Sequence, residues 1–353
     1  MKIAILTPTF HYYSGIDRVA EKQAEDFTAK GSEVTVYCLE ASIKPKGYKV
    51  VEIGMPKNGF LQRIYRLFFF MSRDKINKYG EQMKDYEIVI SHLYPMNIIA
   101  SQARKKYNFK YVYYNHGVGY PELFTNFLEK LYMAVFLRLT NWSIKNADSA
   151  ISVSKFLKDE LKRESGIDSE VAYNEIDSNK FRKGIDGSAV RKKLGISHDE
   201  KVILFVGRMS PHKNLTGLIK MFKILRKKFK NAKLVVVGKP TFRKYYKALR
   251  KAAKSGVLFR EFVDDEELPH YYAACDVYAT CSLWEGFDLP AAEAQACGKP
   301  VVAFGICSHP EIVKNGILVK KNDIKGFAKA IMKIFSEEDG KPKNQAKLQK
   351  KQA

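Results

Sequence analysis

The chain has 353 residues, of which 46% are hydrophobic and 28% are charged, a composition typical of a globular protein with apolar cores. No stretch reaches the roughly 20 apolar residues of a membrane-spanning helix, so the sequence predicts none. The net charge of +23 calls for a polyanionic partner, such as nucleic acid, anionic lipid headgroups or a phosphorylated substrate.

Cysteine usage and the N-terminus bear on the cellular compartment. The five cysteines are odd in number and form no Cys-x-x-Cys pair, so the sequence predicts neither a disulfide framework nor a zinc site. Residues 1–10 contain one lysine and a short apolar run that ends before Pro8, a pattern that predicts a first β-strand and no signal peptide. These features favour a reducing cytoplasm.

Short apolar runs alternate with helical segments along the chain, which predicts parallel βαβ units. In the first half, the expected strands are 2–7, 33–39, 87–91, 110–114 and 149–153, and the expected helices are 18–29, 122–146 and one led by Ser154. In the second half, the expected strands are 201–206, 233–237, 257–262, 276–280 and 300–304, and the expected helices are 215–229, 268–274, 289–296 and 327–335.

The alternation is interrupted once, at the polar, turn-forming residues 174–179. We therefore predict an α/β protein of two Rossmann-like domains, residues 1–175 and 176–335. Residues 336–353 form a basic tail without apolar periodicity, expected to be disordered or to form a short crossover. Because ligands of open parallel sheets bind outside the carboxyl ends of the strands, the informative residues should follow strands.

Two cations follow the expected strand 201–206. Arg208 and Lys213 lie five residues apart in a loop that leads into a helix. The guanidinium fork of Arg208 suits one phosphate and Lys213 offers a point charge to another, while the helix N-terminus adds its dipole. The loop therefore predicts a diphosphate site, although two solvated basic side chains would give the same pattern.

Two glutamates flank the start of a helix after a later strand. Asp288 can cap this helix and Pro290 suits its first turn, so Glu293 would lie near its beginning, with Glu285 in the loop above. Carboxylates so placed can hold pairs of sugar hydroxyls, and Gly286 lets the backbone approach a ligand. The alternative is a capped helix with two surface acids.

Together these residues resemble family 4 of the glycosyltransferases, which are retaining enzymes with the GT-B fold. Glu285 and Glu293, with Gly-Phe and Leu-Pro between them, resemble the two-glutamate motif of the family, and Arg208 with Lys213 resembles its diphosphate-binding pair. Three more segments match in order along the chain, namely residues 14–18, His116-Gly117 and residues 310–313. The resemblance covers the chain to about residue 335.

The resemblance implies a hexosyltransferase with a donor cleft between an N-terminal acceptor domain and a C-terminal nucleotide-sugar domain. It implies a UDP- or GDP-linked donor, with no metal and no other cofactor. His116 would contact the donor sugar, Arg208 and Lys213 would neutralise the leaving diphosphate, Glu285 would bind sugar hydroxyls and Glu293 the ribose. Further donor contacts would come from Gly15, Gly207, Gly238, Val263, Gly286, Phe287 and Leu289.

The chain departs from the family pattern in its motif loops. Asp288 stands where glycine is common, and Ser14 stands where a second glycine is common. Residues 304–309 lack the usual paired glycines before Pro310, and the linker 174–177 replaces the usual Asn-Gly-Val-Asp. The grip of these loops on phosphates is therefore expected to differ.

Two basic segments could meet a membrane surface. Residues 60–71 carry a heavily aromatic face flanked by Arg63, Arg66 and Arg73, which is typical of a basic amphipathic helix at an anionic membrane, although a core helix with exposed arginines also fits. Residues 220–254 contain 14 Lys or Arg and no Asp or Glu. We expect a cytoplasmic protein, peripheral on the inner face of the membrane, with a lipid-linked or glycan acceptor.

The sequence also bears on other partners and functions. Nucleic acid is disfavoured because no nucleic-acid-binding module is present, although Tyr245 and Tyr246 lie among basic residues and could stack bases. A nucleotide-sugar epimerase and a non-catalytic binding protein with the same fold stay open. A Rossmann dehydrogenase is disfavoured, because no Gly-x-Gly-x-x-Gly follows the first strand.

Overall fold

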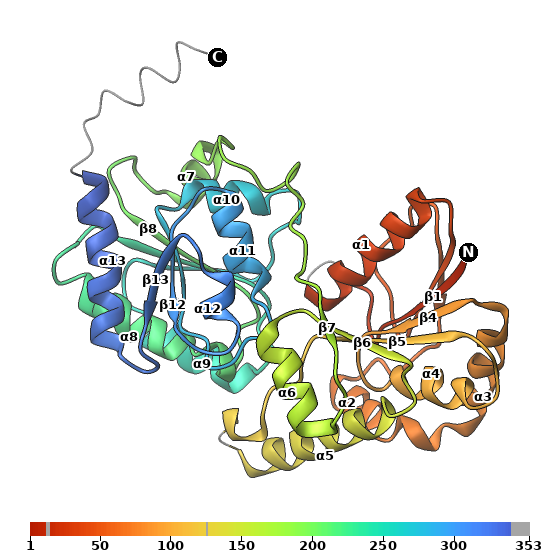
Figure 1. The fold of residues 1–353 in the computed structure, drawn as a ribbon. Helices are drawn as coiled ribbons and strands as arrows, with labels where there is room; N and C mark the ends of the chain where they lie inside the picture. The colour runs from red at the N-terminus through yellow and green to blue at the C-terminus, as the bar shows by residue number, and fades with distance from the viewer. Residues whose placement is uncertain (12–14, 125, 340–353) are drawn as a thin grey trace. The chain divides into compact units, whose positions relative to one another are not determined.

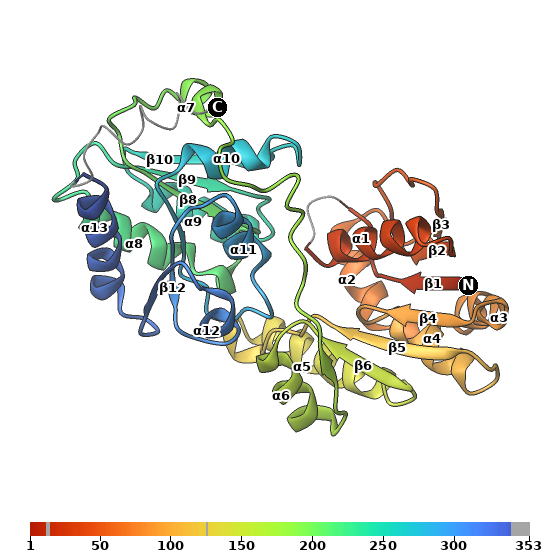
Figure 2. The same cartoon turned by 45° about the horizontal axis from the view of Figure 1, so that its top comes forward.

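The structure is a computed structural model that describes residues 1–11, 15–124 and 126–339. Contacts within the chain divide it into two compact units, residues 1–175 and residues 176–353. The division falls within the polar, turn-forming residues 174–179. Each unit is built on one parallel sheet with helices around it (Figures 1 and 2).

The first unit contains a seven-stranded sheet in the order β3-β2-β1-β4-β5-β6-β7, and every neighbouring pair of strands is parallel. Its strands are β1 Lys2–Leu6, β2 Glu33–Cys38, β3 Lys49–Glu52, β4 Ile88–Ser91, β5 Lys110–Asn115, β6 Ser149–Ser152 and β7 Glu170–Val171. Its α-helices are α1 Gly15–Ala29, α2 Gly59–Leu67, α3 Arg73–Gln82, α4 Asn97–Arg104, α5 Phe127–Ser143 and α6 Lys155–Ser165, and its 3-10 turns are η1 Phe69–Met71, η2 Met83–Asp85 and η3 Pro121–Leu123.

The second unit repeats this plan with a six-stranded parallel sheet in the order β10-β9-β8-β11-β12-β13. Its strands are β8 Val202–Val206, β9 Lys233–Val237, β10 Val257–Arg260, β11 Val277–Thr280, β12 Val301–Phe304 and β13 Gly316–Val319. Its helices are α7 Ser188–Leu194, η4 Pro211–Lys213, α8 Leu215–Leu225, α9 Arg243–Ala252, α10 Leu268–Ala274, α11 Leu289–Ala296, α12 His309–Ile312 and α13 Ile324–Asp339.

Both sheets have the Rossmann strand order, in which the first strand lies between the second and the fourth. The order reverses beside β1 in the first unit and beside β8 in the second. At such a switch point the loops that follow the two central strands diverge and leave room for a ligand. The predicted α/β class with two Rossmann-like domains is therefore what the structure shows.

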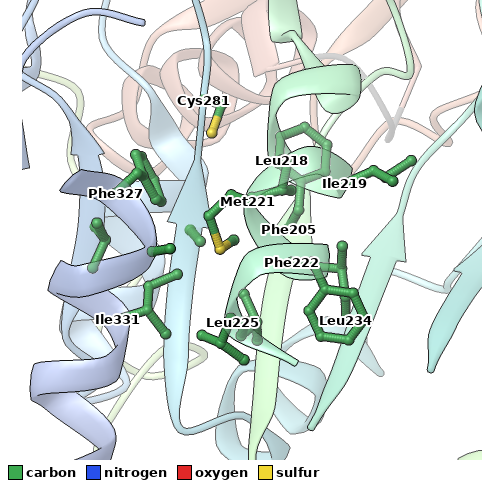
Figure 3. Close-up of a cluster of buried hydrophobic side chains, with 14 of the residues drawn as sticks. Phe205, Leu218, Ile219, Met221, Phe222, Leu225, Leu234, Cys281, Phe327 and Ile331 are labelled. Atoms are coloured by element: carbon green, nitrogen blue, oxygen red, sulfur yellow. The ribbon is translucent and has the colours of Figure 1, made fainter. Parts of the chain in front are cut away.

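The second sheet is buried on both faces, as a parallel sheet requires. Successive residues of β8 alternate between two apolar clusters: Ile203 and Phe205 face α8 and α13, whereas Val202 and Leu204 face α7, α10 and α11. The core on the α8 and α13 side is shown in Figure 3, where Met221, Leu225 and Ile331 are among the side chains that meet. This double burial leaves only the strand ends for polar chemistry.

Several predicted helices have different limits. The expected helix 122–146 begins as η3 and continues as α5, whose N-cap Asn126 accepts hydrogen bonds from the backbone N–H groups of Leu128 and Glu129; residue 125 lies outside the described residues. The expected helix 215–229 ends at Leu225. Helix α13 extends to Asp339, so the first residues of the expected tail are helical, and residues 340–353 lie outside the described part of the chain.

The structure also contains elements that the sequence pattern did not predict, among them β3, α3, α4, α7 and β13. The helices α3 and α7 bury only two residues each, so their apolar periodicity is weak. No helix in the described ranges is long and apolar enough to cross a membrane. The five cysteines are free thiols, four of them buried.

Packing of α13 on the sheet sets the stability of the second unit. The Phe327 ring is fully buried and meets Phe304 edge to face, with the ring centroids 5.4 Å apart. Replacing Phe327 by alanine removes this contact and leaves a cavity, which should lower the free energy of unfolding by about 3–5 kcal/mol. Urea unfolding would measure the loss, and Lys329→Ala, an exposed position on the same helix, should change it little.

Candidate functional site

Two loops of the second unit meet at the switch point of its sheet. Residues 207–214 follow β8 and residues 281–288 follow β11, the strand next to β8. The backbone N–H of Leu283 donates to the carbonyl oxygen of His212 at 2.8 Å, which joins the two loops directly. The structure thus brings the predicted cation loop beside the predicted two-glutamate loop.

The glycines after β8 and β9 allow their two loops to lie against each other. Gly207 and Gly238 have φ angles of +149° and +139°, which side chains rarely adopt. A Cβ atom on Gly238 would lie 2.1 Å from the carbonyl oxygen of Gly207, so no other residue fits there without a shift of the backbone. These two predicted donor-contact residues therefore have a structural role, whatever they bind.

The predicted catalytic residues Lys213 and Glu285 form a largely buried ion pair. Lys213 Nζ lies 2.6 Å from Glu285 Oε1, and the side chains are 14% and 8% exposed. Arg208, by contrast, is exposed. Both cations lie close to His212, whose pKa is held well below its usual value, first by burial and then by the charges of Lys213 and Arg208.

The loop from Glu285 to Asp288 is fixed by groups that follow β12. Asp288 is the N-cap of α11, and its side chain accepts from the backbone N–H of Ala291, as the sequence predicts. The hydroxyl of Ser308 lies 3.1 Å from the carbonyl oxygen of Glu285 and 3.2 Å from that of Phe287. His309 reaches the Asp288 carboxylate. Neither Ser308 nor His309 was predicted as a site residue.

Glu293 lies deeper than a surface acid. Its side chain is fully buried in the first turns of α11, and the hydroxyl of Tyr272 donates to its Oε2 at 2.7 Å. The buried hydroxyl of Tyr278 has a pKa well above its usual value because of burial and then the charges of Asp288, Glu285 and Glu293. The two predicted glutamates therefore do gather in one place, which excludes the alternative of two surface acids.

Three buried side chains of this cluster are spaced like metal ligands. One ligand atom each from Glu285, Asp288 and His309 lie within 4.8 Å of one another. However, both ring nitrogens of His309 already have acceptors, the Phe304 carbonyl oxygen at 2.7 Å and Asp288 Oδ2 at 3.0 Å, and Glu285 is paired with Lys213. The donor set is thus engaged within the protein and does not fit a metal without rearrangement.

The remaining predicted donor contacts of this unit lie around the same loops. Phe287 is buried, Leu289 begins α11 and is half-buried, and Val263 is half-buried and packs against the α10 and α11 side of the core. Gly286 lies between Glu285 and Phe287 in the buried part of the loop. The structure assigns none of these residues a ligand, and Val263 follows β10, an edge strand of the sheet.

The first unit holds a second group of buried polar side chains, after β4 and β5. His116, predicted from the sequence, stacks on His92 with ring centroids 5.1 Å apart, and His92 Nδ1 lies 2.8 Å from His116 Nε2. Burial lowers the pKa of His116 to about 3, and burial followed by the His116 ring lowers that of His92. Both rings are therefore neutral at physiological pH.

His92 was missed by the sequence analysis. It follows the end of β4 directly, so the same rule that singled out His116 after β5 would have found it. The predicted Gly15 begins α1, and the neighbouring Asp17 is buried and accepts hydrogen bonds from Thr9 Oγ1 at 2.8 Å and from the backbone N–H of His11 at 3.0 Å. Ser14 lies outside the described residues.

The chain has two Rossmann-type units. In the second unit, cations suited to phosphates and buried carboxylates follow the central strands. This combination defines a protein of the GT-B class. A family model described as "Glycosyltransferase Family 4" matches residues 13–180, and one described as "Glycosyl transferases group 1" matches residues 187–352. The chain belongs to this family of glycosyltransferases.

Individual proteins agree with this assignment. The chain is 34% identical over 199 residues to the uncharacterized glycosyltransferase MJ1607 of Methanocaldococcus jannaschii, covering 53% of this chain and 50% of that one. It is 29% identical over 140 residues to O-antigen chain mannosyltransferase B of Escherichia coli, covering 38% and 37%. The chain thus spans about half or less of the length of these curated relatives.

A solved structure supports the fold over nearly the whole chain. Anabaena HepE in complex with UDP and glucose superposes with a TM-score of 0.79 at 21% identity, covering 96% of this chain and 91% of that one. At this level of identity the likeness shows the fold and nothing finer.

The Lys213–Glu285 pair predicts a measurable stability effect. Lys213→Met leaves the buried Glu285 carboxylate without its cation and should lower the free energy of unfolding by about 3–5 kcal/mol, because an unpaired buried charge is costly. Lys213→Met combined with Glu285→Gln removes both charges and should recover part of this loss. Urea unfolding would test it. The exposed pair Lys193–Glu267 provides the control, since Lys193→Met should cost no more than about 1 kcal/mol.

Proposed function

We propose that the chain is a retaining glycosyltransferase that transfers a hexose from a UDP- or GDP-linked sugar to a lipid-linked or glycan acceptor. The observation that carries the proposal is the buried Lys213–Glu285 pair, which joins the two motif loops at the switch point of the second sheet. The pair places Lys213, a cation suited to a diphosphate, directly beside Glu285, a carboxylate suited to sugar hydroxyls. Family membership supports the reaction class.

The two cations would act on the leaving group. In the reaction, the bond between the anomeric carbon and the diphosphate oxygen breaks, and the acceptor hydroxyl oxygen forms the new bond as its proton passes to the departing diphosphate. Negative charge grows on the diphosphate, so Arg208, Lys213 and the N-terminus of α8 stabilise the transition state more than the ground state. No metal ion is needed for this role in the proposal.

The carboxylates and the histidine would hold the sugar and the ribose. Glu285 would bind the hydroxyls of the hexose, and Glu293 would bind those of the ribose after its contact with Tyr272 opens. His116, neutral because of burial, would serve as a hydrogen-bonding group to the sugar and not as a proton donor at physiological pH. No side chain is assigned as a covalent nucleophile.

The names of similar proteins bear on the identity of the sugar donor. One is named an O-antigen chain mannosyltransferase, and the fold neighbour HepE was solved with UDP and glucose. These names support a hexose and a nucleoside diphosphate. They leave UDP and GDP as the two donor classes to be compared.

Donor binding and transfer test the proposal together. We expect either UDP or GDP, and not ADP, to raise the thermal midpoint of unfolding, with or without a chelator, and the matching nucleotide-sugar to support hexose transfer. Arg208→Ala and Lys213→Ala should each lower kcat about 100- to 1,000-fold, because each removes charge stabilisation of the leaving group. Lys220→Ala, an exposed position on α8, is the control.

The alternatives give different results in the same experiment. Conversion of the donor alone to an epimer would favour the epimerase, and binding of nucleotide-sugar without transfer to any lipid or glycan acceptor would favour a binding protein. A requirement for added divalent metal would contradict the metal-free mechanism. Absence of binding by all the nucleotides would overturn the proposal.

We also propose that the first unit binds an anionic membrane surface, where a lipid-linked acceptor would lie. Helix α2 buries none of its residues, so it is not a core helix; of residues 60–71, only Phe69 in η1 is buried. Exposed apolar side chains continue from α2 through η1 onto α5, which defines an apolar face that consists of Phe60, Leu61, Ile64, Phe68, Phe70, Met71, Phe127, Leu128, Leu131 and Val135. Patches of this kind mark interaction surfaces.

The two helices of the apolar face are tied together, and their surroundings are basic. The Arg63 guanidinium donates to both carboxylate oxygens of Glu129 and lies 4.6 Å above the Tyr132 ring. The flanking exposed cations are Lys57, Arg73, Lys130 and Arg138. Basic side chains around apolar ones suit anionic headgroups above an acyl layer, where each cation contributes about 1 kcal/mol.

The second basic segment, residues 220–254, has a different character. Tyr245 accepts a hydrogen bond from the backbone N–H of Thr216 and packs against the core, and the Tyr246 hydroxyl donates to Glu261 at 2.6 Å. These rings have partners within the fold, which disfavours the base-stacking role considered for them. The segment presents charge without a comparable apolar face.

Vesicle binding tests the membrane proposal. Phe60→Ser combined with Phe127→Ser and Leu128→Ser should lower sedimentation with phosphatidylglycerol vesicles at least 10-fold, because each exposed side chain loses apolar burial. These positions are exposed, so the fold should survive. A matched charge control, Lys244→Ala with Lys247→Ala on α9, should have a smaller effect. Equal binding by the wild type and the apolar variant, or binding to neutral vesicles alone, would contradict the assignment.

A further inference from the structure

A buried ion pair holds the loop after β11 to the loop after β12 in the second unit. His309 Nε2 lies 3.0 Å from Asp288 Oδ2, and the two side chains are 0% and 2% exposed. The other ring nitrogen, Nδ1, lies 2.7 Å from the carbonyl oxygen of Phe304. A carbonyl oxygen can only accept a hydrogen bond, so Nδ1 carries a proton.

The surroundings of Asp288 favour its ionised form, which fixes the charge of His309. Asp288 caps α11, where the backbone N–H of Ala291 and the helix dipole favour a negative charge. An ionised carboxylate can only accept, so Nε2 of His309 must also carry a proton, and the ring is an imidazolium. Burial would raise the pKa of Asp288, but His309 outweighs burial and holds that pKa below its usual value.

The backbone around the pair is unusual for the residues it contains. Asp288 has a φ angle of +71° and Cys307 has a φ angle of +50°, so two non-glycine residues adopt the left-handed region. These positions correspond to those where the family pattern commonly has glycine. Each such residue costs roughly 1–2 kcal/mol of strain, which must be offset by contacts nearby. The ion pair and the two contacts of Ser308 supply such contacts.

The pair lies next to the proposed reactive groups. Glu285 precedes Asp288 by three residues, and the Ser308 hydroxyl, adjacent to His309, contacts the backbone of Glu285 and Phe287. The buried part of the site holds two ion pairs, Lys213 with Glu285 and His309 with Asp288. The position of the Glu285 carboxylate therefore depends on a loop whose other end is held by His309.

We propose that His309 is a positioning residue: its imidazolium, held between Asp288 and the Phe304 carbonyl, fixes the 285–288 loop and so the place of the Glu285 carboxylate. The part of this inference that concerns sugar binding rests on the proposed function. The ion pair itself does not, and can be tested without a donor.

The pH dependence of stability follows from the charges around the ring. Burial lowers the pKa of His309, but Asp288, then Glu285 and the Phe304 carbonyl, raise it above its usual value, while Lys213 stabilises the Asp288 carboxylate and Tyr278 stays protonated. A raised histidine pKa contributes stability that is complete below the unfolded-state pKa of about 6.5 and is lost as the pH rises through the folded-state value. The contribution should therefore fade on the alkaline side.

The first arm of the test measures unfolding of the full chain between pH 6 and pH 10. We expect His309→Gln to lower the thermal midpoint by about 5–15 °C near pH 6, because it leaves Asp288 buried without its cation. The gap to the wild type should shrink as the pH rises. Asp288→Asn should lower the thermal midpoint by a similar amount, and the double variant should lower it little more than either single variant. The exposed His198→Gln in the same unit is the control.

The second arm measures transfer from whichever nucleotide-sugar the donor comparison selects. His309→Gln should lower kcat/KM for the donor about 10- to 100-fold, and the alkaline fall in the wild-type pH profile should be absent in the variant. Additive losses in the single and double variants, or a midpoint gap that does not change with pH, would overturn the ion pair. If the unfolding measurements support the ion pair but His309→Gln leaves kcat/KM unchanged, the positioning role is overturned. Lack of transfer by the wild type would instead count against the proposed function alone.

Discussion

Both sheets are parallel, and the central strands of the second sheet are buried on both faces; this constraint decides where polar chemistry can occur. In β8, the residues on both faces of the strand are apolar, because each face packs against an apolar core. A parallel strand buried on both faces has no room for a charged side chain along its length. Charged and hydrogen-bonding groups are therefore confined to strand ends, and the carboxyl ends of neighbouring strands gather them at one edge.

Confinement at the strand ends explains why the charges of the second unit occur in pairs. Lys213 and Asp288 would each be expensive to bury alone, but each lies against a partner from a different loop. The pairing makes the cluster electrically balanced and links three loops that follow β8, β11 and β12. A site held in this way is preorganised, because its side chains are fixed by contacts that do not involve a ligand.

Local signals were sufficient for much of this architecture. The strand 233–237 and the helix 289–296 have the limits that the sequence predicts, because one is an unbroken apolar run and the other is marked by a capping aspartate and a proline. The same signals located Lys213, Glu285 and Glu293. They could not show that Lys213 pairs with Glu285, since the two residues are 72 positions apart and only the strand order brings them together.

Two features could not be settled from the sequence. An apolar side chain gives no indication of whether it faces a core or solvent, so the sequence left residues 60–71 open between a membrane-facing helix and a core helix and gave no sign that Phe127 is exposed. The partnership of Asp288 and His309 depends on a left-handed backbone at Asp288; aspartate adopts this region more often than most residues but still uncommonly, so the sequence did not predict it. Prediction from the sequence fails most often where backbone strain and buried charge occur together.

The Asp288–His309 pair also limits the order in which this loop could have changed. A histidine introduced opposite a glycine would bury its ring without an acceptor for Nε2, and an aspartate introduced alone would bury a carboxylate in a strained backbone. Each substitution is unfavourable without the other, so the two positions are coupled and their effects are not additive. Relatives that differ at one position are therefore expected to differ at both, and exchange of a single residue between such relatives should be poorly tolerated in either direction.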